Sequence, residues 1–163
     1  MSKLKTTIRD VTYEDTEALI GLCKAIGLFK PNELEELNGM LSAYFEASLM
    51  GHHKWLTDEE GGELIGVAYY AEETFAYGVF NLLLIGVHRD RQREGRGTKL
   101  LHYVEQELRE RGERILIVET SGLDSFAATR AFYKKNGYDE EARIREYYNL
   151  GEDKIVFRKA LNV

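Results

Sequence analysis

The feature that most constrains this chain is the basic, glycine-containing stretch 92–97, Gln-Arg-Glu-Gly-Arg-Gly. It lies between an apolar run that ends at Val87 and an amphipathic helical pattern that starts near Thr98. A helix N-terminus presents unpaired N–H groups that bind anions, and glycine lets the backbone approach a phosphate closely. The sequence therefore predicts a site for a phosphate-containing ligand in the turn between this strand and this helix.

The local charge supports an anionic ligand. Residues 89–99 contain five Arg or Lys side chains and two acidic ones, whereas the whole chain has a net charge of −6 at pH 7. A small basic region on an acidic protein favours one polyanionic ligand and argues against a nucleic-acid surface.

Three kinds of phosphate-binding loop differ in where they place their glycines. Residues 95–99 lack the frame of a Walker loop. A dinucleotide fingerprint needs a small residue where this chain has Leu100, but Glu119 matches its ribose-binding acid, so a dinucleotide-binding oxidoreductase stays an alternative. The third kind has the pattern Gln/Arg-x-x-Gly-x-Gly/Ala after a strand, and residues 92–97 fit it. An ordinary turn with a solvated basic face is the remaining alternative.

Length and composition favour one domain over residues 1–163. A single cysteine, Cys23, excludes a disulfide framework and a cysteine-based zinc site, and it lies in an apolar helical stretch typical of a core position. His52 and His53 have no third ligand at metal-binding spacing, so no metal is expected. The start of the chain has no signal-peptide pattern, and no apolar run is long enough to span a membrane, so we expect a cytoplasmic protein without membrane contact.

Apolar periodicity predicts an α/β (α+β) chain with seven strands and four helices. The run 77–88 is typical of a central strand buried on both faces, and Gly86 within it indicates a bulge or a close approach of another group. The strands that flank the third helix are expected to be parallel neighbours. The expected strands are 6–11, 54–58, 63–71, 77–88, 114–120, 138–145 and 154–160, the last two joined through 147–151. The expected helices lie between Thr12 and Gly27, from Pro31 to Phe45, from 98 to 111 and from 125 to 135.

A second motif, Ala-Phe-Tyr-Lys-Lys-Asn-Gly-Tyr at 131–138, follows the glycine loop at a characteristic separation. The two motifs and the element order together resemble the GNAT superfamily of N-acetyltransferases, over nearly the whole chain. The resemblance implies the GNAT acyl-CoA N-acyltransferase fold, a mixed central sheet of about seven strands flanked by four helices. It also implies acetyl-CoA as co-substrate.

The resemblance assigns two stretches to acetyl-CoA binding. The backbone of Ile85, Gly86 and Val87 is expected to pair with the pantetheine arm and to supply an oxyanion donor. The loop that wraps the pyrophosphate, mainly through amides, comprises Arg93, Glu94, Gly95, Arg96, Gly97 and Thr98. Among the cations nearby, Arg91, Arg93, Arg96 and Lys99 are candidates for phosphate contacts. The Glu94 side chain is expected to point outward and to pair with a neighbouring arginine.

The resemblance also assigns two catalytic residues. Tyr133 matches the tyrosine that protonates the CoA thiolate, although aromatic packing is the alternative for this side chain. Glu119 resembles the glutamate that serves as base in some relatives, with Glu72, Glu73 and water as rivals. Relatives carry an Asn seven residues before the tyrosine, where this chain has Phe126. In those relatives the Asn bonds pantetheine, and Phe126 has no side-chain amide for that contact.

The function implied is direct transfer of an acetyl group from acetyl-CoA to a primary amine in a ternary complex. The acceptor is a small-molecule amine or a protein amino group, and the resemblance allows a homodimer. The alternative is a GNAT-fold module that binds acyl-CoA as a sensor without turnover.

Overall fold

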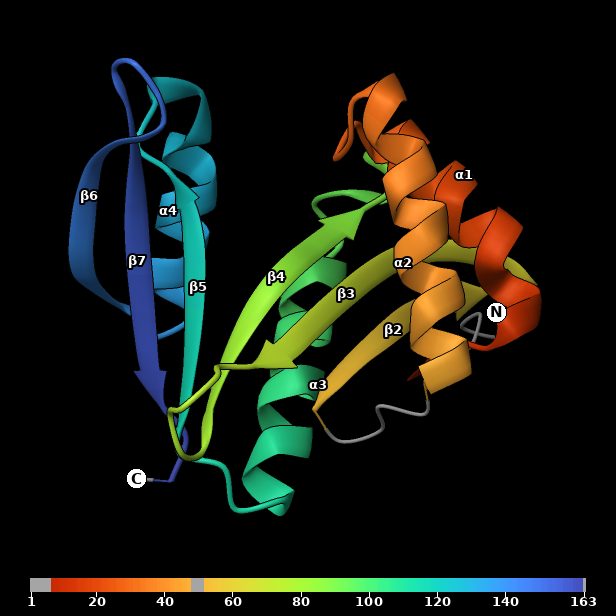
Figure 1. Cartoon of the computed structure of the whole chain (residues 1–163), viewed down its shortest axis with the longest axis horizontal. Helices are drawn as coiled ribbons and strands as arrows, with labels where there is room; N and C mark the ends of the chain where they lie inside the picture. Colours follow the sequence, from red (N-terminus) through yellow and green to blue (C-terminus); the bar gives the residue numbers. More distant parts are fainter. Residues whose placement is uncertain (1–6, 48–51, 163) are drawn as a thin grey trace. The chain divides into compact units, whose positions relative to one another are not determined.

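The computed structural model describes residues 7–47 and 52–162 (Figure 1). Its order of strands and helices agrees with the order expected from the sequence. The strands are β1 (Thr7–Asp10), β2 (His53–Glu60), β3 (Glu63–Glu72), β4 (Val79–Val87), β5 (Ile115–Ser121), β6 (Asp139–Asn149) and β7 (Glu152–Ala160). The α-helices are α1 (Thr16–Ile26), α2 (Leu34–Ala47), α3 (Arg96–Glu110) and α4 (Ala127–Lys135), with short 3-10 turns before α1, α2, α3 and α4.

The strands form one mixed sheet in the order β1-β2-β3-β4-β5-β7-β6. Strands β4 and β5 are parallel, with Val79 opposite Ile115, as expected for two strands joined through a helix. Strand β7 lies antiparallel to both β5 and β6, and β1 lies antiparallel to β2. The expected mixed sheet of seven strands with four helices is confirmed.

The chain divides into two compact units, which are described separately. Unit 1 comprises Met1–Tyr70 and Leu84–Val104, and unit 2 comprises Ala71–Leu83 and Glu105–Val163. Strands β3 and β4 and helix α3 contribute residues to both units. The prediction of one domain over 1–163 stays a prediction.

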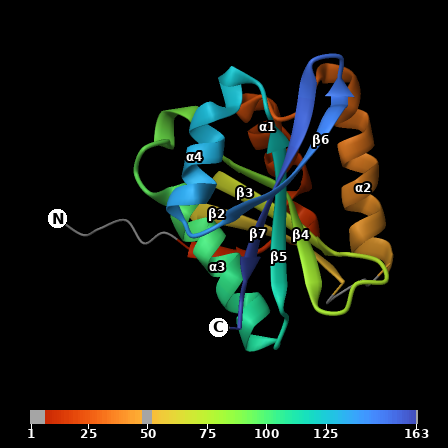
Figure 2. The same ribbon diagram turned by 90° about the vertical axis from the view of Figure 1, so that its left-hand side faces the viewer.

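In unit 1, helices α1 and α2 cover one face of β2 and β3, and the start of α3 lies on the other face (Figures 1 and 2). The apolar faces of α1 and α2 pack on the strands and form the core of this unit. Cys23 is fully buried there, as expected. The buried members of this cluster are Val11, Leu19, Leu22, Cys23, Leu37, Leu41, Trp55 and Val67.

Unit 2 is built from the β5-β7-β6 strands with α4 along one side (Figures 1 and 2). Strand β5 alternates between buried and partly exposed residues, which is typical of a strand with one well-covered face. Every residue of β6, the last strand of the sheet, is exposed. The buried apolar side chains of this unit include residues of β5 and β7, with Phe80 and Leu82 of β4, Leu108 of α3 and Tyr133 of α4.

Three details differ from the sequence-based expectations. The run 77–88 is not buried on both faces, because the Leu83 side chain in β4 is 52% exposed. Residues 147–149 belong to β6 and not to a connecting loop, so the final turn is only Leu150–Gly151. Helix α3 begins at Arg96, two residues before the expected start near Thr98.

Gly86 in β4 marks a close approach of neighbouring side chains, one of the two alternatives expected from the sequence. A Cβ atom there would lie 2.9 Å from Leu28 Cδ1 and 3.3 Å from Ile26 Cγ2. The missing side chain lets the segment after α1 pack directly on the end of β4. No helix in the described part of the chain is long and apolar enough to cross a membrane.

Candidate functional site

The turn between β4 and α3 presents backbone donors at a helix N-terminus. The first hydrogen bond of the helix runs from Lys99 N to Gly95 O, at 3.1 Å, so the N–H groups of residues 96–98 precede the helical pattern. Gln92 Nε2 donates to Val87 O at 3.1 Å and ties the turn back to the end of β4. This arrangement suits an anion, because free N–H groups and the helix dipole converge at the same end.

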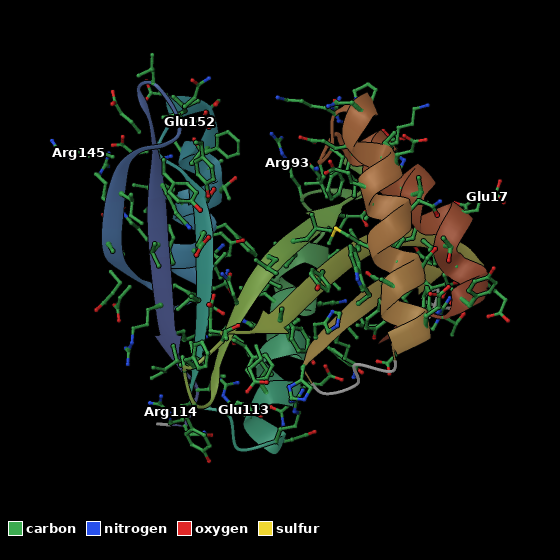
Figure 3. The ribbon with its side chains drawn as sticks, in the orientation of Figure 1. Glu17, Arg93, Glu113, Arg114, Arg145 and Glu152 are labelled. Atoms are coloured by element: carbon green, nitrogen blue, oxygen red, sulfur yellow. The ribbon has the colours of Figure 1, made fainter. Side chains whose placement is uncertain are left out.

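Two residues of this turn have a left-handed backbone. Gly95 has φ 78°, and a side chain there would meet nothing within 4 Å, so the position is open. Arg93 has φ 66°, which is unfavourable for a residue with a side chain, and it is exposed with its guanidinium extending from the loop (Figure 3). Left-handed residues in a turn bring successive N–H groups to one side and form an anion-binding concavity. The residues present therefore fit a phosphate group.

The side chain of Arg96 is committed to the protein itself. It is buried, with a relative exposure of 6%, and it donates to Asp58 Oδ2 at 3.2 Å and to Glu60 Oε2 at 2.7 Å. A third bond joins it to Glu94 Oε2 at 2.9 Å. Burial opposes its charge, but the bonds to Glu94 and Asp58 raise the pKa of Arg96 above its ordinary value. The guanidinium of Arg96 therefore anchors the start of α3 to β2.

Glu94 pairs with its neighbours, as expected from the sequence. Arg91 Nε lies 3.3 Å from Glu94 Oε1, and Arg91 also reaches Glu60. The bonds from Arg96 and Arg91 hold the pKa of Glu94 below its usual value. Within residues 7–47 and 52–162, Arg89, Arg93 and Lys99 form no ion pair, so they are the cations of this stretch that remain for a ligand.

The end of β4 lies on the same unit as this turn. Ile85 and Gly86 are partly exposed, and Val87 is 9% exposed. The backbone N–H of His88 donates to Ile65 O at 2.7 Å, which holds the strand end against β3. His88 Nδ1 accepts from Asp90 N at 3.2 Å and caps the short turn that follows.

In unit 2, Tyr133 is buried on α4 with a relative exposure of 3%. Its ring contacts Phe132, Tyr138 and Phe157, with centroids 5.3, 5.7 and 5.6 Å away. Burial raises the pKa of the Tyr133 hydroxyl. The aromatic packing that was the alternative for Tyr133 is present, and the role of Tyr133 as the acid stays a prediction.

Glu119, near the end of β5, belongs to a polar network of five side chains. Asn81 Nδ2, from β4, donates to Glu119 Oε1 at 3.2 Å and to Glu73 Oε1 at 3.0 Å. Lys154 Nζ, from β7, lies 2.7 Å from Glu119 Oε2 and 4.0 Å from the centre of the Tyr147 ring. The structure thus brings Glu119 together with Glu73, one of the rival bases.

Lys154 is the cation of this network. The residue is 8% exposed. Burial opposes its charge, but the carboxylate of Glu119 and the Tyr147 side chain raise the pKa of Lys154. Asn81 and Lys154 were not among the residues selected from the sequence. A polar residue inside the apolar run 79–87 was the only signal that could have indicated Asn81.

Two further expectations concern single positions. Phe126, where relatives carry an Asn, directly precedes α4 and is 39% exposed. Its side chain supplies no polar group there.

Within residues 7–47 and 52–162, no group of three or more His, Cys, Asp or Glu side chains is arranged to hold a metal ion. His53 instead has its Nδ1 2.8 Å from the Tyr69 hydroxyl. That the protein needs no metal stays a prediction.

Residues 16–138 match the model of the acetyltransferase (GNAT) family. Because this match spans most of the chain, the protein belongs to the GNAT family of acetyltransferases. The activity of the family is acetyl transfer. A search of curated proteins gave no match.

Solved structures give the same assignment. A protein assigned to the GNAT family of acetyltransferases, from Desulfovibrio desulfuricans, is 28% identical with a TM-score of 0.90, covering 96% of this chain and 99% of that one. The ribosomal-protein-S18-alanine N-acetyltransferase of Escherichia coli is 22% identical with a TM-score of 0.79, covering 98% and 96%. YncA of Salmonella typhimurium, solved with acetyl-CoA, is 20% identical with a TM-score of 0.78, covering 96% and 94%. The last two likenesses show the shared fold alone.

Proposed function

We propose that this protein transfers an acetyl group from acetyl-CoA to a primary amine, by direct attack in a ternary complex. The observation that carries the proposal is the turn at 92–98, where a left-handed backbone and free helix N–H groups suit a pyrophosphate. Membership of an acetyltransferase family supports acetyl transfer, and a relative solved with acetyl-CoA supports this donor.

The co-substrate is proposed to bind along the end of β4 and over the turn. The backbone of Ile85, Gly86 and Val87 pairs with the pantetheine arm, and a backbone N–H near Val87 stabilises the oxyanion. The pyrophosphate lies on the amides of Arg93, Glu94, Gly95, Arg96, Gly97 and Thr98. Arg93 and Lys99 contact phosphates through their side chains, whereas the Arg96 guanidinium stays with Asp58 and Glu60.

The proposed reaction needs a base and an acid. A carboxylate, Glu119, accepts the proton that frees the lone pair of the acceptor nitrogen. The C–N bond then forms as the C–S bond breaks, and the Tyr133 hydroxyl gives its proton to the departing thiolate. A tyrosine hydroxyl is protonated at neutral pH, so Tyr133 has a proton to give to the departing thiolate.

The acceptor is proposed to be a small-molecule amine or a protein amino group. A relative of the same fold acetylates the alanine of ribosomal protein S18, which shows that this fold serves a protein substrate in that enzyme. We also propose that residues 1–163 act as one domain, and a homodimer is compatible with this function. Light scattering on the purified chain measures the oligomeric state.

The experiment that tests the proposal is release of the CoA thiol from acetyl-CoA, followed with a thiol reagent. A panel of alkylamines, amino acids, aminoglycosides and peptides is added one at a time. Release that depends on an added amine, with an acetylated product in the mass spectrum, supports the proposal. Binding of acetyl-CoA without any amine-dependent release favours the alternative, a sensor module without turnover.

A further inference from the structure

Asn81 holds two carboxylates with one amide. It lies inside unit 2 with a relative exposure of 5%, and its Nδ2 donates to Glu73 Oε1 and to Glu119 Oε1. These bonds fix the amide orientation, because an Asn81 oxygen in that place would face two carboxylates. Two carboxylates are therefore held next to one buried amide in unit 2.

The other end of Asn81 has no partner. Its Oδ1 is buried and accepts no hydrogen bond from residues 7–47 and 52–162. A buried acceptor without a partner costs folding free energy, and an apolar side chain at this position of β4 would not carry that cost. What an asparagine adds at this position is the pair of hydrogen bonds that it donates to Glu73 and Glu119.

Only one of the two carboxylates is neutralised. Lys154 Nζ lies 2.7 Å from Glu119 Oε2, and its ammonium also faces the Tyr147 ring. Within the part of the chain that the structure describes, no cation pairs with Glu73, and its Oε2 receives no donor. The network of Glu73, Glu119 and Lys154 therefore carries one uncompensated negative charge, which is on Glu73.

The backbone also holds Glu73 in place. Its N–H donates to Val79 O at 2.9 Å, and its carbonyl accepts from Ala76 N at 3.3 Å, so the loop from 73 to 79 closes on itself. The residue is partly exposed, which leaves the carboxylate open to a ligand. A fixed, accessible and unpaired carboxylate suits a cation.

We propose that Glu73 binds the ammonium group of the acceptor and that Asn81 is the positioning residue that holds Glu73 beside Glu119. That the bound ammonium is the acceptor rests on the proposed function. Lys154 pairs with Glu119 Oε2, so the charge that attracts the ammonium lies on Glu73, and Glu119 stays beside it as the proposed base. The site takes a primary ammonium and rejects a neutral group of the same shape, because a neutral group leaves the charge of Glu73 unpaired.

The test is an NMR titration of the protein with n-butylammonium chloride at constant ionic strength. The amide protons of the Asn81 side chain report binding directly, and n-butanol is the neutral control. We expect n-butylammonium to shift these signals and n-butanol to leave them in place. Equal shifts with both compounds, or no shift with either, overturn the inference.

Variants test each residue with the same probe. Glu73→Gln and Asn81→Leu are expected to weaken n-butylammonium binding by about tenfold or more. Glu110→Gln, at the exposed end of α3, is the matched control and keeps the wild-type affinity. Wild-type binding by Glu73→Gln overturns the proposal, and this variant decides the matter if Asn81→Leu does not fold.

Kinetics separates positioning from a merely structural role. With any amine found in the thiol-release assay, Glu73→Gln and Asn81→Leu should raise the KM for the amine by about tenfold while kcat changes little. An unchanged KM contradicts the proposal. Binding of n-butylammonium needs no acetyl-CoA, so loss of this site and failure of the acetyltransferase function give different results.

Discussion

Arg96 Nη1 lies 3.2 Å from Asp58 Oδ2, and both side chains are almost fully buried. Arg96 is the first residue of α3, and Asp58 lies in β2, so this ion pair fixes the start of the helix on the β2–β3 hairpin. The turn that supplies the anion-binding N–H groups comes directly before that start. The pair therefore connects the stability of unit 1 with the geometry of the proposed pyrophosphate site.

Replacing Arg96 should destabilise the protein strongly. In Arg96→Ala, Asp58 stays buried without its cation, whereas Glu60 keeps Arg91, and removing one partner of a buried pair costs about 3–5 kcal/mol. Arg96→Lys should recover only part of this, because one ammonium cannot reproduce the bonds of a guanidinium to Asp58, Glu60 and Glu94. Urea unfolding measures both variants. A loss below about 1 kcal/mol in Arg96→Ala contradicts this account.

Replacing Arg93 should affect binding and not stability. Its side chain is exposed and forms no ion pair with the described residues, so Arg93→Ala should change the free energy of unfolding by less than about 0.5 kcal/mol. Loss of one charge-assisted bond to a phosphate should weaken acetyl-CoA binding by about tenfold. Calorimetric titration measures the affinity. The difference in acetyl-CoA affinity between the wild type and Arg93→Ala should shrink as salt is added. An unchanged affinity removes Arg93 from the site.

Tyr133→Phe separates the chemical role of this residue from its packing. The ring contacts with Phe132, Tyr138 and Phe157 survive the change, so the melting temperature should stay close to that of the wild type. If the hydroxyl protonates the thiolate, amine-dependent turnover should fall by about 10²-fold or more, the usual contribution of a general acid. Acetyl-CoA affinity, measured in parallel, should be retained. Wild-type turnover would show that Tyr133 only packs.

Asp15 should make stability depend on pH in the acid range. Its hydrogen bond with Arg9 lowers the pKa of Asp15 from 3.8 to about 2 in the folded protein. A lowered folded pKa contributes stability above pH 3.8, and this contribution is lost as the pH falls toward about 2. The difference in unfolding free energy between wild type and Asp15→Asn should therefore shrink over that window. Glu17→Gln, at an exposed carboxylate on α1 (Figure 3), is the control and should show no such trend.

Local patterns predicted the helices and strands well, because the apolar periodicity of each one depends on residues that are close in sequence. Leu100, Leu101, Val104 and Leu108 recur at helical spacing in the helix expected over 98–111, and all four are fully buried. Gly27 ends α1 in a left-handed conformation, as its position after the apolar stripe indicated. The prediction that Leu83 is buried was wrong. Burial of a strand residue depends on which element covers its face, and an apolar run does not specify that element.

The candidate site was predictable only in part. The turn at 92–97 was found because strand, glycines and helix are contiguous in sequence. The pairing of Arg96 with Asp58 joins residues 38 positions apart, so no local pattern indicates it. The network at Asn81 is equally hidden from local patterns, because its members come from β4, β5, β6, β7 and the loop after β3. Contacts between distant segments decide which charges are free to meet a ligand.

The most direct test of the central claim is thermal melting with acetyl-CoA and, separately, with NAD. A ligand at about 100 times its dissociation constant stabilises the folded state by about 2.7 kcal/mol, which raises the melting temperature by several degrees. We expect this rise with acetyl-CoA and none with NAD. No rise with acetyl-CoA, or an equal rise with NAD, would contradict the assignment of the turn at 92–98 to acetyl-CoA.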